Sequence, residues 1–313
     1  MHAVTIVEGR LEWREHPDPT PGSGEVLVRV RAAGMNSADL IQQKGFYPAP
    51  PGWPADIPGL ELAGEVVELG PGATRFAVGD RVMAVVGGGG QAELAVVHER
   101  HLMPVPDAVD WPAAGGFPEV FTTAHDALFT QCGLAAGERV CVHGAAGGVG
   151  LAGVQLAVSA GASVVATVRN ESLRADVAAF GATAVEPDGF GAHGPFDVVL
   201  ELIGGPNISD DLQALAIGGR IVVIGVGGGA RAEIDLFGLM GKRARMHGST
   251  LRARPHEEKG AAARAVERHV LPLLADGRIR VPVAATFPMA DADAAYARFE
   301  QGGKLGKIVL VAG

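Results

Sequence analysis

The chain has 313 residues, a length that favours two domains over one, and 48% of its residues are hydrophobic, which is ordinary for a globular protein. Its 26 basic residues against 35 acidic ones give a net charge of −9, so neither a nucleic-acid surface nor a polybasic patch for anionic lipid is expected. Two cysteines cannot form a disulfide framework, and no signal-like or membrane-length apolar run occurs. We therefore expect a soluble, cytoplasmic protein that acts on a small molecule.

Residues 1–110 contain short apolar runs separated by glycine and proline, which predicts a β-rich domain. Strands are expected at 3–7, 25–32, 64–69, 81–86 and 92–97. The proline-rich segment 47–58 cannot be regular structure, because each proline removes an N–H donor and fixes φ. We predict a loop there, and loops commonly carry substrate contacts.

From Trp111 onward, helical patterns alternate with strand patterns. This alternation predicts a doubly wound parallel sheet that binds its ligand at the carboxyl ends of the strands. The expected strands are 139–143, 163–167, 183–186, 197–202, 220–224 and 245–250. The expected helices are 113–131, broken near Pro118, and 148–160, 171–180, 208–217 and 236–243.

The end of the chain has a long helical pattern at 256–276, then a strand at 281–285, a helix at 290–301 and a last strand at 307–311. The final strands resemble the strands of the first domain in their spacing along the sequence. We therefore predict an α/β protein with a β-rich domain, 1–115 and 277–313, and an inserted nucleotide domain, 116–276. The substrate is expected between the two domains.

A glycine turn after the first strand of the second domain predicts a dinucleotide site. A literal G-x-G-x-x-G match covers 148–153, which already lies in the helical run, so we prefer the register Ala145-x-Gly147-x-x-Gly150. Gly147 would let the backbone approach a phosphate at the helix N-terminus, and Gly150 would let helix and strand pack. A purely structural turn is the alternative, but the strand that follows at 163–167 favours a nucleotide-binding βαβ unit.

The end of the second strand of this domain indicates which cofactor is bound. An NAD site places an acidic residue there to bond the ribose hydroxyl, whereas this chain has Arg169. A guanidinium suits a 2′-phosphate by charge and by geometry, so NADPH is predicted. A solvated surface arginine is the alternative, and Arg174 is a second candidate for the phosphate.

Several segments resemble the zinc-free quinone oxidoreductase and zeta-crystallin branch of the medium-chain dehydrogenase/reductase family. They are RVRAAGMNSAD at 29–39, KGFYP at 44–48, PGLELAG at 58–64, VGDRV at 78–82, HGAAGGVG at 143–150 and GKIVL at 306–310. Within this branch, 88–92, 102–106 and 248–254 resemble the group of the tumour-suppressor-inducible quinone reductase. The resemblance implies a GroES-like catalytic domain, a Rossmann-type domain, NADPH and a homodimer formed through the edge strand at 245–249.

The resemblance also implies which residues contact the cofactor: Thr122, His125, Ala146, Gly147, Gly148, Val149, Thr167, Arg169, Asn170, Gly204, Ile224, Gly225, Val226, Thr250, Leu251 and Lys304. Plain loop formation is the alternative for the glycines, and a polar place at the domain seam is the alternative for His125. A basic group near the adenosine phosphate is implied at Lys304 and Lys307, although both could be solvated lysines of the tail.

Hydride transfer to a quinone needs orientation and exclusion of water rather than a catalytic triad. Asn36 and Tyr47 are the candidate catalytic residues, as contacts to substrate or nicotinamide. Tyr47 could instead only anchor the proline loop, and Asp39 could be a helix cap or turn residue. No metal is expected, because zinc members of the wider family carry a histidine where this chain has Leu60, and two scattered cysteines cannot complete a zinc site.

The predicted function is zinc-independent, NADPH-dependent reduction of quinones. The first alternative keeps the fold and cofactor but reduces an activated alkene, such as an enoyl thioester or an alkenal. The second alternative is a cofactor-binding protein without significant turnover.

Overall fold

The computed structural model describes residues 1–313, and they fall into two compact units. Unit 1 comprises residues 1–122, 251–302 and 306–313, and unit 2 comprises residues 123–250 together with 303–305. Residues 251–276 thus lie in unit 1, whereas the boundaries drawn from the sequence assigned them to the nucleotide domain. The reason is that α8 (His256–His269) packs on elements of unit 1: His101 Nε2 donates to the carbonyl of His256 at 3.1 Å, and Arg75 pairs with Glu267 at 2.6 Å.

Unit 1 is built on one seven-stranded sheet. Its strand order is β14-β15-β3-β4-β5-β7, and β6 also pairs with β3, while β1 and β2 form a separate hairpin. The last two strands of the chain therefore complete a sheet whose other strands lie within residues 25–104, which confirms the predicted β-rich domain. The bounds are β1 His2–Val7, β2 Arg10–Glu15, β3 Glu25–Gly34, β4 Glu61–Leu69, β5 Arg81–Val85, β6 Leu94–His98, β7 Leu102–Pro104, β14 Val283–Pro288 and β15 Lys307–Val311.

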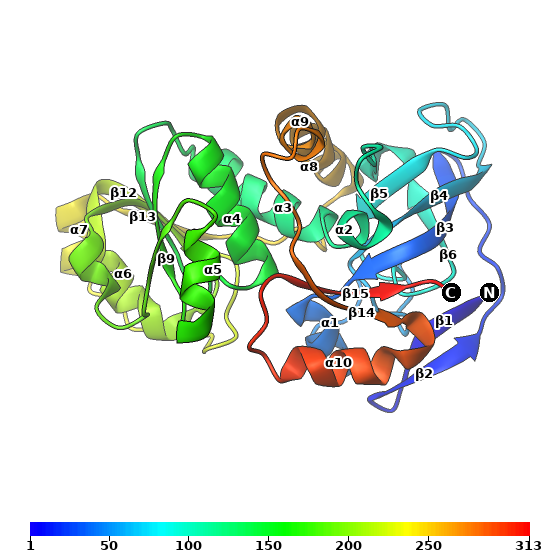
Figure 1. The fold of residues 1–313 in the computed structure, drawn as a ribbon, viewed down its shortest axis with the longest axis horizontal. Helices are drawn as coiled ribbons and strands as arrows, with labels where there is room; N and C mark the ends of the chain where they lie inside the picture. Colours follow the sequence, from blue (N-terminus) through cyan, green and yellow to red (C-terminus); the bar gives the residue numbers. More distant parts are fainter. The chain divides into compact units, whose positions relative to one another are not determined.

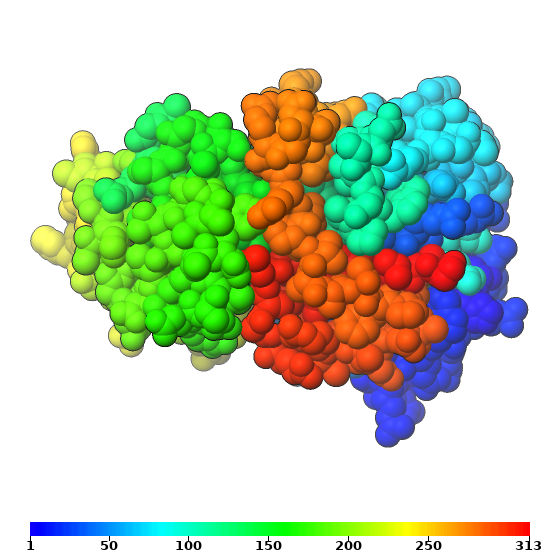
Figure 2. Space-filling model, viewed as in Figure 1, coloured from blue at the N-terminus to red at the C-terminus, as the bar shows by residue number.

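Short helices cover this sheet. The predicted helix at 256–276 is two helices, α8 and α9 (Leu271–Ala275), because Pro272 cannot continue α8 and stands in the first turn of α9. In α10 (Ala292–Glu300), Ala292, Ala295 and Tyr296 face the core, and the opposite face is solvent-exposed, as the orange-red surface in Figure 2 shows. The others are α1 Ser37–Gln43, η1 Glu99–His101, α2 Trp111–Gly115, α3 Pro118–His125, within which the unit boundary falls, and η6 Met289–Asp291.

Unit 2 holds a six-stranded sheet in which every neighbouring pair is parallel, with the order β10-β9-β8-β11-β12-β13. This is the predicted Rossmann-type sheet. Its interior is apolar, with Cys141, Val199 and Ile221 among the buried residues. The bounds are β8 Arg139–Val142, β9 Ser163–Thr167, β10 Thr183–Val185, β11 Phe196–Glu201, β12 Leu215–Val223 and β13 Arg245–Gly248.

The helices of unit 2 follow from right-handed crossovers between these strands. The chain runs from β8 outward through α4 and α5 to β10, and in the other direction from β11 through α6 and α7 to β13, so the two pairs cover opposite faces. Figure 1 shows α4 and α5 near β9, and α7 beside β12 and β13. The bounds are η2 Asp126–Gln131, a π-helix, α4 Gly148–Ser159, η3 Glu171–Leu173, α5 Arg174–Ala178, η4 Phe190–His193, η5 Gly205–Asn207, α6 Ile208–Ala214 and α7 Leu236–Lys242.

One boundary in unit 2 differs from the sequence reading. The helix predicted at 208–217 ends at Ala214, and β12 begins at once with Leu215, which is buried and pairs with Phe196. Burial of Leu215 at the start of a strand outweighs the helical pattern there. None of the helices in residues 1–313 combines the length and the apolar character needed to cross a bilayer.

Candidate functional site

The glycine turn of unit 2 leaves a helix N-terminus open. Gly144 has φ +61°, which favours glycine, and Gly147 is the N-cap of α4 with no side-chain capping bond. A Cβ on Gly150 would lie 2.5 Å from the carbonyl oxygen of Gly144, so only glycine lets the helix close on the turn. The first N–H groups of α4 are therefore available to an anion, where the helix dipole also favours negative charge.

The end of β9 places a positive charge at the same edge of the sheet. Arg169 is solvent-exposed and has no hydrogen-bond or ion-pair partner. Asn170 instead caps η3, since its Oδ1 accepts from Ser172 N at 3.1 Å, and a Cβ on Gly303 would lie 3.9 Å from its Nδ2. The segment that carries Lys304 thus lies beside Asn170. Arg174 is engaged otherwise, because its Nε donates to the carbonyl of Val168 at 3.1 Å.

The turns after β11 and β12 approach each other through glycine. Gly204 has φ +102° and forms an isolated bridge with Gly229, and a Cβ on Gly204 would lie 2.6 Å from the Gly229 oxygen. A Cβ on Gly225 would lie 2.4 Å from the Leu202 oxygen. A side chain at either glycine would force these turns apart, which is a packing reason for glycine that applies with or without a ligand.

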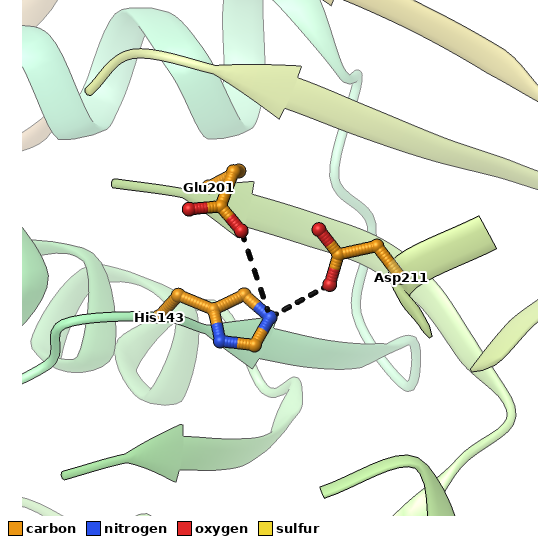
Figure 3. Close-up of side chains that lie close together, drawn as sticks. All are labelled: His143, Glu201 and Asp211. Atoms are coloured by element: carbon orange, nitrogen blue, oxygen red, sulfur yellow. Dashed lines mark hydrogen bonds and ion pairs between the residues drawn. The ribbon is translucent and has the colours of Figure 1, made fainter. Parts of the chain in front are cut away.

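Beneath these turns lies a buried group of three charged side chains, His143, Glu201 and Asp211. Figure 3 shows the imidazole of His143 facing both carboxylates. Its Nε2 lies 2.7 Å from Asp211 Oδ1 and 3.9 Å from Glu201 Oε2, and its Nδ1 lies 3.0 Å from Thr167 Oγ1. All three side chains are at most 1% exposed. A buried charge is tolerable only when it is paired, and here each charge depends on the others.

The electrostatics of this group favour a charged histidine at neutral pH. Burial by itself would lower the pKa of His143, but the hydrogen bond to Asp211 and the contact with Cys141 outweigh it and raise the pKa to about 11. Burial raises the pKa of Asp211 to about 6, although His143 opposes this shift. The donor atoms lie within 4.8 Å of one another, a spacing seen in metal sites, yet His143 and Asp211 already share a hydrogen bond. The arrangement is therefore that of an ion pair.

Sequence reasoning placed His143 at a strand end and missed both carboxylates. A signal was present, because Glu201 follows three apolar residues at the end of the strand FDVVLE, at the edge where ligands are expected. Asp211 gave no such signal, since an acidic residue in the first turn of a short helix is ordinary.

Unit 1 contains a second buried ionic group, around Lys307. The ammonium donates to Glu61 Oε1 at 2.6 Å, to the carbonyl of Met35 at 2.6 Å and to Asn36 Oδ1 at 2.9 Å. Asn36 Nδ2 donates in turn to Glu61 Oε1 at 2.9 Å. Lys307 is 2% exposed, so the reading of it as a phosphate contact or a solvated tail lysine is wrong; its charge is used internally. Both ends of the Asn36 amide are likewise engaged within the protein.

This group includes Glu61, the neighbour of Leu60, at which zinc members of the wider family are expected to carry a histidine. Leu60 is buried and offers no ligand atom, and the neighbouring Glu61 is bound by the Lys307 ammonium. Asp39 accepts from the backbone N–H of Asn36 at 2.8 Å and of Gly59 at 3.1 Å, and burial raises its pKa to about 7. The residues present therefore do not fit a zinc site, which needs several unengaged Cys, His or carboxylate ligands.

Tyr47 is held in place by Arg252. The Arg252 guanidinium lies 4.8 Å from the centre of the Tyr47 ring, its Nη1 donates to the Tyr47 carbonyl at 2.7 Å, and its Nε donates to the carbonyl of Gly87 at 2.8 Å. The phenol itself has no hydrogen-bond partner. Burial raises the pKa of Tyr47, so the phenol stays protonated at neutral pH and can donate a hydrogen bond. Sequence reasoning missed the contact of Arg252 with Tyr47, because 205 positions of sequence separate the two residues.

The remaining predicted residues are divided between the units. Thr122 and Leu251 line a small cavity of unit 1, and the Thr122 hydroxyl is buried without a partner. His125, in unit 2, is buried with its ring 5.0 Å from that of Phe129. Ala146, Ile224 and Val226 belong to the turns of unit 2, Val149 lies in the first turn of α4, and Thr250 is exposed beyond the end of β13. Their contacts with a cofactor stay a prediction.

Comparison with known proteins agrees with this geometry. Residues 22–107 match the alcohol dehydrogenase GroES-like domain, and residues 161–310 match the zinc-binding dehydrogenase domain. The quinone oxidoreductase of Rattus norvegicus is 31% identical over 94% of this chain and 91% of its own length, and the acryloyl-coenzyme A reductase of Metallosphaera sedula is 30% identical over 99% of both. The chain also matches the polyketide synthase GfsB of Streptomyces halstedii at 35% identity over 92% of its residues, but it spans only 5% of that protein.

Solved structures share the fold. A mycobacterial protein complexed with NADPH superposes with a TM-score of 0.88 at 26% identity, over 99% of this chain and 100% of the other. The chain belongs to the medium-chain dehydrogenase/reductase family. Its class is therefore that of the oxidoreductases that use a nicotinamide cofactor on small-molecule substrates.

Proposed function

We propose that this protein is a zinc-independent reductase that uses NADPH to reduce quinones in the cytoplasm. The observation that carries the cofactor choice is Arg169, an exposed guanidinium without a partner at the end of β9, where an NAD site would have an acid. The uncapped N-terminus of α4 supports the diphosphate part of the site. The likeness to quinone oxidoreductases along nearly the whole chain supports the acceptor.

The protein's contribution in this proposal is to bind, orient and exclude water. Bound NADPH supplies a hydride, and a quinone can take up its protons from water. Tyr47 is the proposed hydrogen-bond donor to the acceptor oxygen, because its phenol is protonated and uncommitted and its loop is fixed by Arg252. For Asn36 the proposal is weaker, since its amide already bonds Glu61 and Lys307.

The cofactor proposal is tested with Arg169→Ala. Removing the guanidinium should raise the KM for NADPH at least tenfold, which corresponds to about 1.4 kcal/mol, and should leave the KM for NADH little changed. Steady-state kinetics with both cofactors measure this. Arg139→Ala is the matched control, because it removes the same charge from the opposite end of the same sheet. Equal losses with NADPH and NADH would remove Arg169 from the phosphate site.

A second candidate function is reduction of an activated alkene. It is favoured by the likeness to acryloyl-coenzyme A reductase over 99% of both chains. Oxidation of NADPH should be followed with ortho-quinones, para-quinones, enals and enoyl thioesters at matched concentrations. The substrate class with the highest kcat/KM decides between the two reductase activities, and negligible turnover with all four classes would point to a cofactor-binding role.

We also propose a homodimer through the edge of the unit 2 sheet. The strand β13 has a partner on one side only, and unpaired strand edges invite pairing with another chain. Exposed apolar side chains gather in the elements next to it, with Phe237 84% and Met240 71% exposed on α7 and Met246 36% exposed on β13 itself. Sedimentation of the wild type and of Phe237→Glu tests this, and a monomeric wild type would refute it.

A further inference from the structure

We infer that His143 is a positioning residue for dinucleotide binding: clamped by Asp211, it holds the turns after β8, β9 and β11 in one arrangement without itself contacting the dinucleotide. This inference rests on the proposed function, because it assigns a role within the nucleotide site of unit 2. His143 is the last residue before the glycine turn, and its side chain is 1% exposed. It can therefore act on a bound ligand only through the turns around it.

The first connection runs from His143 to the end of β9. Its Nδ1 lies 3.0 Å from Thr167 Oγ1, and the backbone of the same threonine accepts a bond from Ala145 N, in the glycine turn, at 3.1 Å. The glycine turn is thus fastened to β9 twice, once through the His143 ring and once through its own backbone. Arg169 follows Thr167 by two residues, so the same contacts fix the position of the backbone that carries the Arg169 side chain.

The second connection runs to β11 and the turn that follows it. His143 N donates to the carbonyl of Leu200 at 3.0 Å, and its Nε2 lies 3.9 Å from Glu201 Oε2. Glu201 in turn holds the next turn, because its Oε1 accepts from Gly204 N at 2.7 Å and its Oε2 accepts from Asn207 Nδ2 at 3.0 Å. One imidazole therefore joins three of the turns that form the ligand edge of the sheet.

Asp211 fixes the orientation and the tautomer of this imidazole. A carboxylate can only accept, so Nε2 must carry a proton towards Asp211 Oδ1, while Nδ1 meets Thr167 Oγ1, a hydroxyl that can either accept or donate. The hydrogen bond to Asp211 also raises the pKa of His143. The second oxygen of Asp211, Oδ2, is buried without a partner. An amide at this position carries no charge and has a donor as well as an acceptor, so it should no longer hold the ring in one tautomer and orientation.

The test is Asp211→Asn in the full-length protein, with Asp210→Asn as the matched control. Asp210 is the exposed neighbour on the same helix, so the control removes the same charge without touching the network. We expect the Kd for NADPH, measured by calorimetry, to rise at least tenfold in Asp211→Asn and to stay unchanged in Asp210→Asn. The KM for NADPH should rise in proportion while kcat stays within twofold of wild type, because the affected turns do not carry the acceptor. Amide exchange of residues 144–150 and 202–205 should become faster in the unliganded variant.

The outcomes are separable. A wild-type protein that binds neither NADPH nor NADH would refute the proposed function, and this inference with it. A wild type that binds, together with a folded Asp211→Asn protein of unchanged Kd, would overturn the inference alone. So would a reduced kcat with unchanged KM, which is the signature of a smaller folded fraction. If Asp211→Asn does not fold, Glu201→Gln takes its place, since it keeps oxygen and size but removes the second charge; an unchanged Kd in that variant would also overturn the inference.

Discussion

Each unit contains a fully buried ionic group, around Lys307 in unit 1 and around His143 in unit 2, and the two groups differ in how completely they are bonded. In unit 1, the three donors of the Lys307 ammonium reach three oxygens, and both oxygens of Glu61 accept, Oε2 from Glu119 N at 2.9 Å. In unit 2, His143 is hydrogen-bonded to Asp211 and pairs with Glu201 at 3.9 Å, and Oδ2 of Asp211 has no partner. A closed neutral group such as the first has no reason to respond to a ligand. The second carries excess negative charge and joins the turns of the nucleotide edge, so its state and the shape of that edge are coupled.

The largest effect is expected from opening the closed group. Lys307→Met leaves the Glu61 carboxylate buried without a counter-charge, which should lower the free energy of unfolding of unit 1 by about 3–5 kcal/mol. Urea unfolding followed by tryptophan fluorescence reports on this unit, because Trp13, Trp53 and Trp111 all belong to it. Lys44→Met is the control: the Lys44–Glu300 pair is 2.6 Å long but exposed, and its loss should amount to less than about 1 kcal/mol. Similar losses in both variants would show that burial does not distinguish the two pairs.

The next effect is a partial recovery. Adding Glu61→Gln to Lys307→Met removes the unpaired charge while keeping an oxygen that accepts from the N–H of Glu119. About 2 kcal/mol or more of the lost free energy of unfolding should therefore be regained.

 The double variant is compared with both single variants in the same urea experiment. The coupling between the two side chains is the sum of the two single losses minus the loss in the double variant. No recovery would mean that the Lys307 hydrogen bonds to Met35 and Asn36, rather than its charge, hold this region together.

The last effect, the smallest when taken per pH unit, is a pH dependence confined to unit 2. The pKa of His143 is raised to about 11 from 6.5, so its contribution to stability is fully present below pH 6.5 and is lost as the pH rises through 11. The slope from this one group is at most about 1.4 kcal/mol per pH unit. Asp211, with its pKa raised to about 6, has finished titrating before pH 8 and does not interfere.

Amide exchange of β8 and β11 between pH 8 and 10 measures this, after correction for the intrinsic exchange rate. His143→Gln removes the titrating group, so the difference in stability between wild type and variant should shrink as the pH rises. A constant difference across this range would show that His143 is neutral in the folded protein.

Much of the fold was predictable from local patterns. The alternation of strands and helices in 139–250 is a local property of the chain, and it gave the parallel sheet because crossovers have one hand. The glycine turn and Arg169 were equally readable, since their roles depend on residues close in sequence. Helix ends were less accurate: Pro272 divides one predicted helix, and Leu215 begins a strand where the pattern favoured helix.

The sequence by itself determined the class of the protein, because periodicity, turn residues and family motifs are short-range properties that survive without knowledge of the fold. Only the tertiary structure decided how the charges are used. Lys307 reaches Glu61 across 246 positions of sequence, and His143 reaches Asp211 across 68. A buried charge is stable only beside its partner, and such partners are brought together by the folding of the whole unit rather than by any local pattern.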